Sequence, residues 1–375
     1  MLVSTSRADL GIYEPVSAAL GASEGIETSI LLIGEHDAGS LQGDGGIERV
    51  PGGVDGDSAV AVGRWLGRVL EATAEILSRT RPDIVVVLGD RTEMHAAASA
   101  TVPFLIPLAH IHGGELTLGA IDDALRHSLT KLSHIHFVST ERYAERVVQM
   151  GEERWRVIVS GAPGLDNVSS VDLMDAGELE SELGVPKDGR VALVTMHPET
   201  LDPGHETEHL TAMLDALDAW VGRVVFTAPN DDVGRSIILS SIETYVQTHP
   251  NAVLIPDSGT RGYLSLMTRA DVMVGNSSSG IIEAASFGLP VVNVGHRQDG
   301  RIRSANVIDV GHASKEISAA MARACSEGFR DSLAGLVNPY GDGHAGERIA
   351  GTLAEIELGP RLLRKGFVDL PEGSE

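Results

Sequence analysis

Cysteine is nearly absent from this chain of 375 residues, in which Cys325 stands alone. An intramolecular disulfide and a zinc cluster built from thiolates are therefore excluded. The sequence also lacks an apolar run of the roughly 20 residues that a membrane-spanning helix needs. Its first residues, 1–5, lead directly into polar residues without the apolar core of a signal peptide. We therefore expect a cytoplasmic protein without a membrane partner.

Basic residues are scarce as well. Lys and Arg number 29 against 53 Asp and Glu, and the formal net charge is −24. A field of this sign repels polyanions, so nucleic acid is not an expected partner. Because very few of the basic residues are lysines, the positive charge is carried mainly by arginine, which favours bidentate grips on phosphate or carboxylate.

The length and the hydrophobic content of 42% are sufficient for two domains of ordinary size. Short β-rich apolar segments alternate with longer segments of helical period, such as residues 61–79, and this alternation is typical of a parallel, doubly wound sheet. One series of strands is expected at residues 1–5, 28–34, 83–90, 104–111, 135–140 and 156–161, and a second at 191–198, 223–230, 251–257, 271–280 and 289–295. The fold class predicted is α/β with two Rossmann-like domains.

The connection between the two domains is expected within residues 161–190, which are rich in Gly, Pro, Ser and acidic residues. We predict an N-terminal domain at 1–165 and a C-terminal domain at 166–344. The remaining residues, 345–375, are predicted to form an amphipathic helix and a tail that cross back toward the N-terminal domain. A ligand cleft is expected between the two domains.

Residues 36–58 contain many glycines and show no clear period. We expect them to form a mobile loop rather than regular structure, and such a loop could close over a ligand.

Polar residues follow several predicted strands, at the edge where open α/β sheets bind ligands. They occur in "STSRAD", "LGDRTE", "HIHGGE", "TMHPE" and "GNSSSG". Each segment taken alone is consistent with a loop that satisfies its own backbone. Five such segments in one chain favour a functional site.

Residues 274–303 combine a strand, a Ser/Gly turn and the start of a helix, whose free amides form a ready anion site. In this interpretation Ser277, Ser278 and Gly280 approach a diphosphate, and Glu283 accepts hydrogen bonds from ribose hydroxyls. Arg297 adds positive charge nearby. The alternative is a plain serine cap with a structural glutamate. Neither a P-loop nor a G-x-G-x-x-G motif is present, which disfavours an ATPase or a standard dinucleotide enzyme.

Residues 109–137 contain five histidines. His110 and His112 are spaced as neighbours on one face of a strand, and with Glu115 or His127 they offer an alternative zinc site. We predict no metal, because acid/base and phosphate-binding roles account for the same residues. The last two histidines, His134 and His136, are expected to lie in the core or in the wall of the cleft.

Together, the segments "GDR", "HIHGGE", "GAIDDALRHSLTKLSHIHF" and "GNSSSGIIEAASFGLPVVNVGHRQDGR" resemble the hydrolysing UDP-N-acetylglucosamine 2-epimerases of sialic-acid and related nonulosonate biosynthesis. The resemblance spans nearly the whole chain. It implies a glycosyltransferase-B-like fold, a UDP-sugar substrate bound between the domains, no cofactor, and a homodimer or homotetramer. It also implies release of UDP and of the free 2-epimer by elimination and hydration.

The same resemblance implies roles for individual residues. Asp90 and Asp122 would be acid/base groups, and His197 would belong to the active site. Glu115 would contact the substrate. Apart from the resemblance, Arg126 is expected to orient its neighbours or to touch the substrate. The nucleotide would be held by Arg7, Arg91, Ser277, Ser278, Gly280, Glu283 and Arg297.

One position departs from the family pattern His-Ile-Glu-Gly-Gly-Glu, since His112 replaces the first, catalytic glutamate. An imidazole can act as a general base as a carboxylate does. His112 therefore either takes over the catalytic role, or marks a subfamily that acts on a sugar such as a diacetamido-trideoxyhexose, or leaves hydrolysis without epimerisation.

We expect conversion of UDP-N-acetylglucosamine to UDP and N-acetylmannosamine, with the diacetamido-trideoxyhexose as the alternative substrate. A non-hydrolysing 2-epimerase, a glycosyltransferase and an inactive UDP-sugar-binding protein remain further alternatives.

Overall fold

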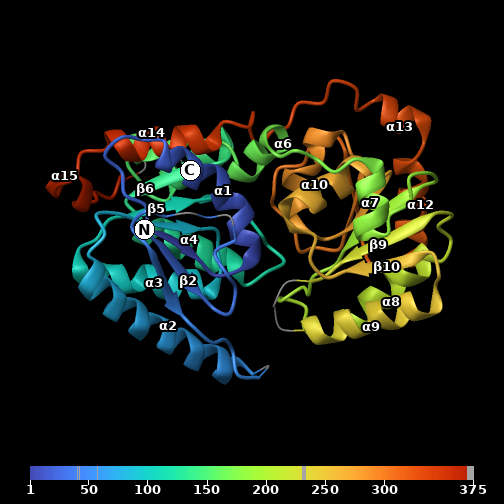
Figure 1. The fold of residues 1–375 in the computed structure, drawn as a ribbon, viewed down its shortest axis with the longest axis horizontal. Coiled ribbons are helices and arrows are strands. Elements are labelled where there is room, and N and C mark those ends of the chain that lie inside the picture. Colours follow the sequence, from blue (N-terminus) through green and yellow to red (C-terminus); the bar gives the residue numbers. More distant parts are fainter. Residues whose placement is uncertain (40, 42, 57, 230–233, 370–375) are drawn as a thin grey trace. The chain divides into compact units, whose positions relative to one another are not determined.

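The chain forms two compact units (Figure 1), and the computed structural model describes residues 1–39, 41, 43–56, 58–229 and 234–369. Unit 1 comprises Met1–Glu115, Asp122–Ser169 and Tyr340–Glu375, and unit 2 comprises Leu116–Ile121 and Ser170–Pro339. The divisions lie a few residues from the expected boundaries at 165 and 344. The assignment of the short segment Leu116–Ile121 to unit 2 was not expected.

Unit 1 is built on a seven-stranded parallel sheet with the order β3-β2-β1-β4-β5-β6-β7. Its inner strands are short, mainly apolar segments that are buried along their whole length, as strands covered by helices on both faces must be. The strands are β1 (Leu2–Ser4), β2 (Ile30–Ile33), β3 (Ile47–Val50), β4 (Val85–Leu88), β5 (Leu108–Ile111), β6 (Ile135–Val138) and β7 (Val157–Val159).

The edge strand β3 contradicts the expectation of an irregular loop over residues 36–58. It pairs with β2 in register from Ile30 and Ile47 onward. Its sequence "IERV" includes two charged residues, and Ile47 is 45% exposed, so the strand lacks the buried apolar run that revealed the others. Residues 40, 42 and 57 of this stretch lie outside the described residues.

The helices of unit 1 follow the strands in the alternating order of a doubly wound sheet. They are α1 (Arg7–Gly21), α2 (Ala59–Thr80), α3 (Thr92–Thr101), α4 (Asp122–Leu132), α5 (Glu141–Gln149), α6 (Asp166–Ser170), α14 (Ala345–Glu355) and α15 (Pro360–Leu363). Short 3₁₀ turns are η1 (Val102–Phe104), η2 (Arg154–Arg156) and η3 (Pro163–Leu165). The long helix α2 contains the segment predicted from its period.

Helix α14 packs against α1 within unit 1 (Figure 1). Gly346 permits the close approach, because a Cβ atom there would lie 2.7 Å from the carbonyl oxygen of Pro15 in α1. Asp166 accepts hydrogen bonds from the amides of Ala345 and Gly346 at 2.9 and 2.7 Å, which satisfies donors at the helix N-terminus. The end of the chain is thus an integral part of unit 1.

Unit 2 contains a six-stranded parallel sheet with the order β10-β9-β8-β11-β12-β13. Its strands are β8 (Val191–Thr195), β9 (Arg223–Thr227), β10 (Ala252–Ile255), β11 (Val272–Gly275), β12 (Val291–Val294) and β13 (Val307–Val310). The edge strand β13 was not predicted, and its partly exposed sequence "VIDV" again explains why. Asn230, at the end of a predicted strand, lies outside the described residues.

Helices cover both faces of this second sheet, with α8 and α9 on one side and α7 and α10 on the other in Figure 1. Two hydrophobic clusters fill the two faces. The helices are α7 (Ala176–Leu183), α8 (Glu206–Leu217), α9 (Arg235–Thr248), α10 (Gly259–Arg269), α11 (Ser278–Ile282), α12 (Ser314–Ala324) and α13 (Glu327–Asp331), with η4 (Ala284–Phe287) after α11. The prediction of two Rossmann-like domains is therefore confirmed.

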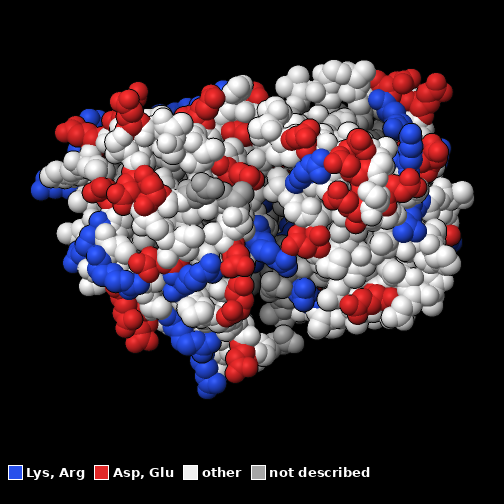
Figure 2. Space-filling view, viewed as in Figure 1, with Lys and Arg blue, Asp and Glu red and all other residues white. Residues whose placement is uncertain are grey.

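None of the helices in the described ranges combines the length and the apolar content that a membrane crossing requires. Figure 2 shows acidic and basic side chains interspersed on the visible surface of each unit.

A buried carboxylate anchors the C-terminal segment to unit 1. Glu152 is fully buried and pairs with Lys131 at 2.5 Å, Lys365 at 2.9 Å and His136 at 3.0 Å. Burial by itself raises the pKa of Glu152, but hydrogen bonds from His136, Lys131 and Lys365 outweigh it and lower the pKa to about 2. Lys365 also donates to the carbonyl oxygens of Lys131 and Ser133.

We predict that Glu152→Gln lowers the free energy of unfolding by about 3 kcal/mol at neutral pH, because two lysines then lose their buried counter-charge. Since the folded-state pKa of Glu152 lies below its ordinary value of 4.5, its stabilisation is present above pH 4.5. The difference between variant and wild type should shrink as the pH falls from 4.5 towards 2.

Urea unfolding at several pH values measures this difference. Glu145→Gln, at an exposed position of α5, is the matched control and should leave the stability unchanged. A Glu152→Gln effect that does not depend on pH would contradict the electrostatic explanation.

Candidate functional site

The carboxyl ends of four adjacent strands, β1, β4, β5 and β6, lie at one edge of the sheet in unit 1. The order of the strands reverses between β1 and β4, where ligands bind in folds of this kind. The segments that follow these strands contain most of the predicted site residues of the N-terminal half.

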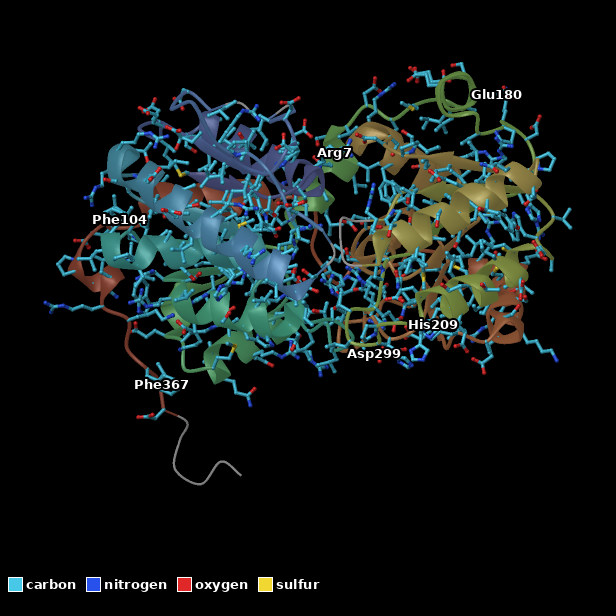
Figure 3. The ribbon with its side chains drawn as sticks, turned by 90° about the horizontal axis from the view of Figure 1, so that it is seen from below. Arg7, Phe104, Glu180, His209, Asp299 and Phe367 are labelled. Carbon is cyan, nitrogen blue, oxygen red and sulfur yellow. The ribbon has the colours of Figure 1, made fainter. Side chains whose placement is uncertain are left out.

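Arg7 is the first residue of α1, directly after β1, and its side chain is exposed (labelled in Figure 3). The turn before it is organised by Asp9, whose carboxylate accepts hydrogen bonds from the amides of Thr5 and Ser6 at 2.7 and 3.1 Å. This capping arrangement fixes the direction in which the helix leaves the strand. Asp9 was not identified from the sequence, although its position in the first turn is typical of a cap.

Asp90 follows β4 and lies beside Arg126 of α4, whose guanidinium donates to the Asp90 carboxylate. Arg126 is only 1% exposed, whereas the Asp90 side chain is 22% exposed. The same guanidinium donates to the carbonyl oxygen of Glu115 at 3.2 Å. Arg126 is therefore placed to orient Asp90, one of the two roles predicted for it. Arg91 comes next and caps α3 with its backbone.

The side chain of His110 in β5 contacts both the turn that carries Asp90 and helix α4. Its Nε2 lies 2.8 Å from the carbonyl oxygen of Gly89, and its Nδ1 lies 3.2 Å from the Thr130 hydroxyl. Burial lowers the pKa of His110 to about 3, so the ring is neutral at physiological pH. Nε2 thus holds the turn that presents Asp90, and Nδ1 joins β5 to α4.

The turn after β5 begins at His112, which has a left-handed backbone with φ of 66°. This conformation is uncommon for a residue other than glycine. Gly114 follows with φ of 76°, and a Cβ atom there would lie 2.5 Å from the carbonyl oxygen of Tyr143. Arg146 donates a hydrogen bond to the carbonyl oxygen of Gly114. Gly114 is therefore required by the packing of the turn against α5.

Within this turn, His112 contacts the carboxylate of Glu115. The His112 Nδ1 lies 2.7 Å from Glu115 Oε1, and the hydroxyl of Ser139 donates to the same oxygen at 2.7 Å. Glu115 is fully buried and His112 is 9% exposed. Ser139 follows β6 and was not identified from the sequence. The predicted contact of Glu115 with substrate stays a prediction.

Asp122 and Asp123 form the first turn of α4, and both are partly buried. Acidic residues at this position stabilise the helix through its dipole. Asp123 lies 3.9 Å from Arg126 and 3.5 Å from His127. Asp122 therefore belongs to the helix that also carries Arg126.

The alternative zinc site finds no support in this geometry. The strand β5 ends at Ile111, so His110 and His112 do not share a strand face, and His110 is engaged as described. Over the described ranges, no group of three or more His, Cys, Asp or Glu side chains is arranged to hold a metal ion. His136 is fully buried against Glu152, in agreement with the core position expected for it.

In unit 2, the carboxyl ends of β8, β11 and β12 are adjacent. Asn276, which follows β11, accepts a hydrogen bond from the amide of His197 at 2.7 Å and donates to the His197 carbonyl at 2.9 Å. Asn276 is fully buried, and His197 is 5% exposed. This pairing fixes the backbone of the "TMHP" segment beside the "GNSSSG" segment.

The "GNSSSG" segment turns closely against β8. A Cβ atom at Gly275 would lie 1.9 Å from the carbonyl oxygen of Thr195, so only glycine fits there. Ser277 caps α11, which has five residues and continues as the 3₁₀ turn η4. A helix is therefore present where one was predicted after the Ser/Gly turn. Ser278, Gly280 and Glu283 lie in and directly after this helix.

Arg297 follows β12 and donates to the carbonyl oxygen of Asn276 at 3.3 Å. Gln298 donates to the same oxygen at 2.8 Å and is 1% exposed. The structure therefore brings together the predicted residues His197, Ser277 and Arg297 around one buried asparagine. Neither Asn276 nor Gln298 was identified from the sequence, because amide side chains carry no charge or spacing signal that distinguishes support from a surface turn.

Comparison with solved structures defines the class of fold. UDP-GlcNAc 2-epimerase from Neisseria meningitidis bound to UDP-GlcNAc superposes with a TM-score of 0.82 at 19% identity, over 95% of this chain and 99% of that chain. The Methanocaldococcus jannaschii UDP-GlcNAc 2-epimerase in complex with UDP-GlcNAc and UDP gives a TM-score of 0.75 at 17% identity, over 94% and 98%. The glycosyltransferase-B-like fold predicted from the sequence is confirmed.

A sequence profile described as UDP-N-acetylglucosamine 2-epimerase matches residues 18–354, and the chain belongs to this family. The UDP-N,N'-diacetylbacillosamine 2-epimerase (hydrolyzing) of Legionella pneumophila is 35% identical over 97% of both chains. The GDP/UDP-N,N'-diacetylbacillosamine 2-epimerase (hydrolyzing) of Campylobacter jejuni is 35% identical over 86% of this chain and 84% of its own. The Neisseria meningitidis UDP-N-acetylglucosamine 2-epimerase is 33% identical over 82% and 81%.

We predict that Asn276→Ala lowers the free energy of unfolding by about 2 kcal/mol, because it removes the hydrogen-bond partners of two buried backbone groups of His197. Urea unfolding followed by circular dichroism measures the loss. The control is Asn251→Ala, at an exposed asparagine that donates to the carbonyl of Gly222 at 2.9 Å. Equal effects of the two substitutions would show that the Asn276 pairing provides no special support.

Proposed function

We propose that the protein is a hydrolysing 2-epimerase that converts UDP-2,4-diacetamido-2,4,6-trideoxyhexose to UDP and the free 2-epimer. The proposed proton transfer rests mainly on one observation, the placement of Asp90 and His112. The two residues follow the neighbouring strands β4 and β5, and each is held by a buried partner, Arg126 or Glu115. Two independently oriented acid/base groups are what removal and return of a proton on opposite faces require.

The substrate assignment rests on the relatives. Two of them are named as hydrolysing 2-epimerases, one of UDP-N,N'-diacetylbacillosamine and one of GDP/UDP-N,N'-diacetylbacillosamine, whose sugar is the diacetamido-trideoxyhexose considered above as part of the alternative substrate. They support this alternative better than the first expectation, UDP-N-acetylglucosamine. UDP-N-acetylglucosamine remains the second candidate, because the Neisseria meningitidis relative named for it is 33% identical.

The reaction that fits these groups begins with cleavage of the bond between C1 and the diphosphate oxygen. UDP leaves with the bonding electrons, and a base removes the proton from C2, so that a glycal forms. Water then adds its oxygen to C1 while a proton is delivered to the opposite face of C2. Asp90, His112 and Asp122 are the proposed proton-transfer groups, and a positioned general acid or base contributes about 10²- to 10⁴-fold.

Unit 2 supplies the proposed nucleotide site. Ser277, Ser278 and Gly280 would contact the diphosphate, Glu283 the ribose and Arg297 the developing negative charge of UDP. Preorganised donors of this kind stabilise a departing anion without the need for a proton. His197 is held in the same place by Asn276, and Arg7 and Arg91 of unit 1 complete the proposed set.

A homodimer or homotetramer is part of the same proposal and rests on the resemblance to the family alone. A cytoplasmic location is proposed with it, in line with the single cysteine of the chain. Light scattering of the purified protein tests the assembly state.

Proton NMR in D₂O with each of the two donors tests the function. We predict release of UDP together with a free 2-epimer that carries deuterium at C2, with a kcat/KM at least about tenfold higher for the diacetamido donor. Retained C2 protium and configuration would identify a hydrolase without epimerisation. A UDP-linked epimer would identify a non-hydrolysing enzyme, and absence of turnover with both donors would reject the proposal.

Asp90→Asn and Asp122→Asn are each predicted to lower kcat by about 10²- to 10⁴-fold, because an amide cannot exchange the proton. Steady-state UDP release measures the loss. Asp83→Asn is the control, since Asp83 is exposed just before the opposite end of β4 and should leave kcat unchanged. Wild-type rates in either Asp90 or Asp122 variant would remove that residue from the mechanism.

A further inference from the structure

The contact between His112 and Glu115 is a feature that the family pattern does not explain. Glu115 Oε1 lies 2.7 Å from the His112 Nδ1 and accepts the Ser139 hydroxyl at 2.7 Å, while Ser139 Oγ lies 3.2 Å from the same Nδ1. All three side chains belong to unit 1 and are buried. Histidine at position 112 is thus accompanied by a carboxylate directly behind its ring.

We propose that Glu115 and Ser139 are positioning residues for His112, and that the imidazole, held by this buried carboxylate, performs the proton transfer that the family pattern assigns to a glutamate. The inference rests on the proposed function for its chemistry. It gives Glu115 a role behind the reacting group, in place of the substrate contact expected from the sequence.

The geometry fixes the tautomer of the ring. A carboxylate can only accept a hydrogen bond, so Nδ1 must carry the proton in the contact with Glu115 Oε1. The neutral ring is then unprotonated at Nε2, which becomes the nitrogen that exchanges a proton with the substrate. Ser139 holds the Glu115 oxygen in place through its own donated hydrogen bond.

The backbone supports the same role. His112 adopts a left-handed conformation, with φ of 66°, and its amide donates to the carbonyl oxygen of Phe137 at 3.0 Å. A backbone conformation of this kind is disfavoured for a residue with a β-carbon and persists where the surrounding structure fixes it. Strand β6 and the residue that follows it therefore both hold His112, through the Phe137 carbonyl and through Ser139.

The arrangement keeps one of the two carboxylates of the family pattern. Replacing glutamate by imidazole at position 112 removes a carboxylate from the acid/base position, and Glu115, the second glutamate of the pattern, lies 2.7 Å from the Nδ1 of the ring. Two positively charged side chains contact the backbone of this turn, Arg126 at the Glu115 carbonyl and Arg146 at the Gly114 carbonyl. They hold the turn that carries the pair.

A double-mutant cycle tests the coupling. Glu115→Gln should lower kcat for the diacetamido donor by about 10²-fold and leave KM within about twofold, because the imidazole loses its charged support while the binding groups stay in place. His112→Glu restores the family residue and should retain activity. Adding Glu115→Gln to His112→Glu should change kcat by less than about threefold, because a glutamate at 112 needs no imidazole support.

Equal losses from Glu115→Gln in both backgrounds would overturn the proposal and assign Glu115 a general structural role. If Glu115→Gln fails to fold, as judged by circular dichroism, Ser139→Ala takes its place in the cycle with an expected loss of about tenfold.

Nitrogen-15 NMR of the histidines in the wild-type protein tests the tautomer without substrate. We expect His112 in the Nδ1–H form, with the downfield proton of a hydrogen bond to a carboxylate, and an upfield shift of that proton in Glu115→Gln. A ring protonated only at Nε2 would overturn the proposal. If the wild type turns over neither donor but shows this signature, the proposed function fails while the positioning of His112 stands.

Discussion

The turn that follows β5 is the constraint on which the N-terminal half of the candidate site depends. His112 reverses the chain in a left-handed conformation, and Gly114 passes too close to Tyr143 for any side chain. This geometry carries Glu115 back beneath the imidazole, where Arg126 binds its carbonyl oxygen and also reaches Asp90. The residues of the motif "HIHGGE" thus act together: Gly114 permits the turn, and Glu115 contacts the ring of His112.

In each unit, one buried polar side chain joins the segments that follow two adjacent strands. In unit 1, the guanidinium of Arg126 joins the segments that follow β4 and β5, and in unit 2 the amide of Asn276 joins those that follow β8 and β11. A buried polar group stabilises a fold only when its partners are all in place. Such groups therefore hold adjacent strand ends in one arrangement, which is what a site assembled from several loops requires.

Much of the fold was predictable from the sequence, because strands buried on both faces leave uninterrupted aliphatic runs, as at residues 85–88 and 272–274. The edge strands β3 and β13 were not predicted, since these partly exposed strands carry charged residues that interrupt the apolar run. The motifs located Asp90, His112 and Ser277 at strand ends. They could not reveal Ser139 or Asn276, whose contacts join segments distant in the chain, nor the left-handed backbone of His112, since a histidine gives no signal for it. Asp9 was also not identified, although its contacts with Thr5 and Ser6 are local and its place in the first turn of α1 is typical of a cap.

The central claim is that UDP leaves by cleavage of the bond between C1 and oxygen, with support from oriented acid/base groups, rather than by attack of water on phosphorus. Turnover of the diacetamido donor in H₂¹⁸O, followed by ³¹P NMR of the released UDP, tests this claim most directly. The account predicts UDP whose β-phosphate contains no ¹⁸O, because the oxygen that linked C1 to the β-phosphorus leaves with UDP and comes from the substrate. Incorporation of ¹⁸O into the β-phosphate would contradict it, since water would then have attacked phosphorus and the proton-transfer groups of unit 1 would have no part in the reaction.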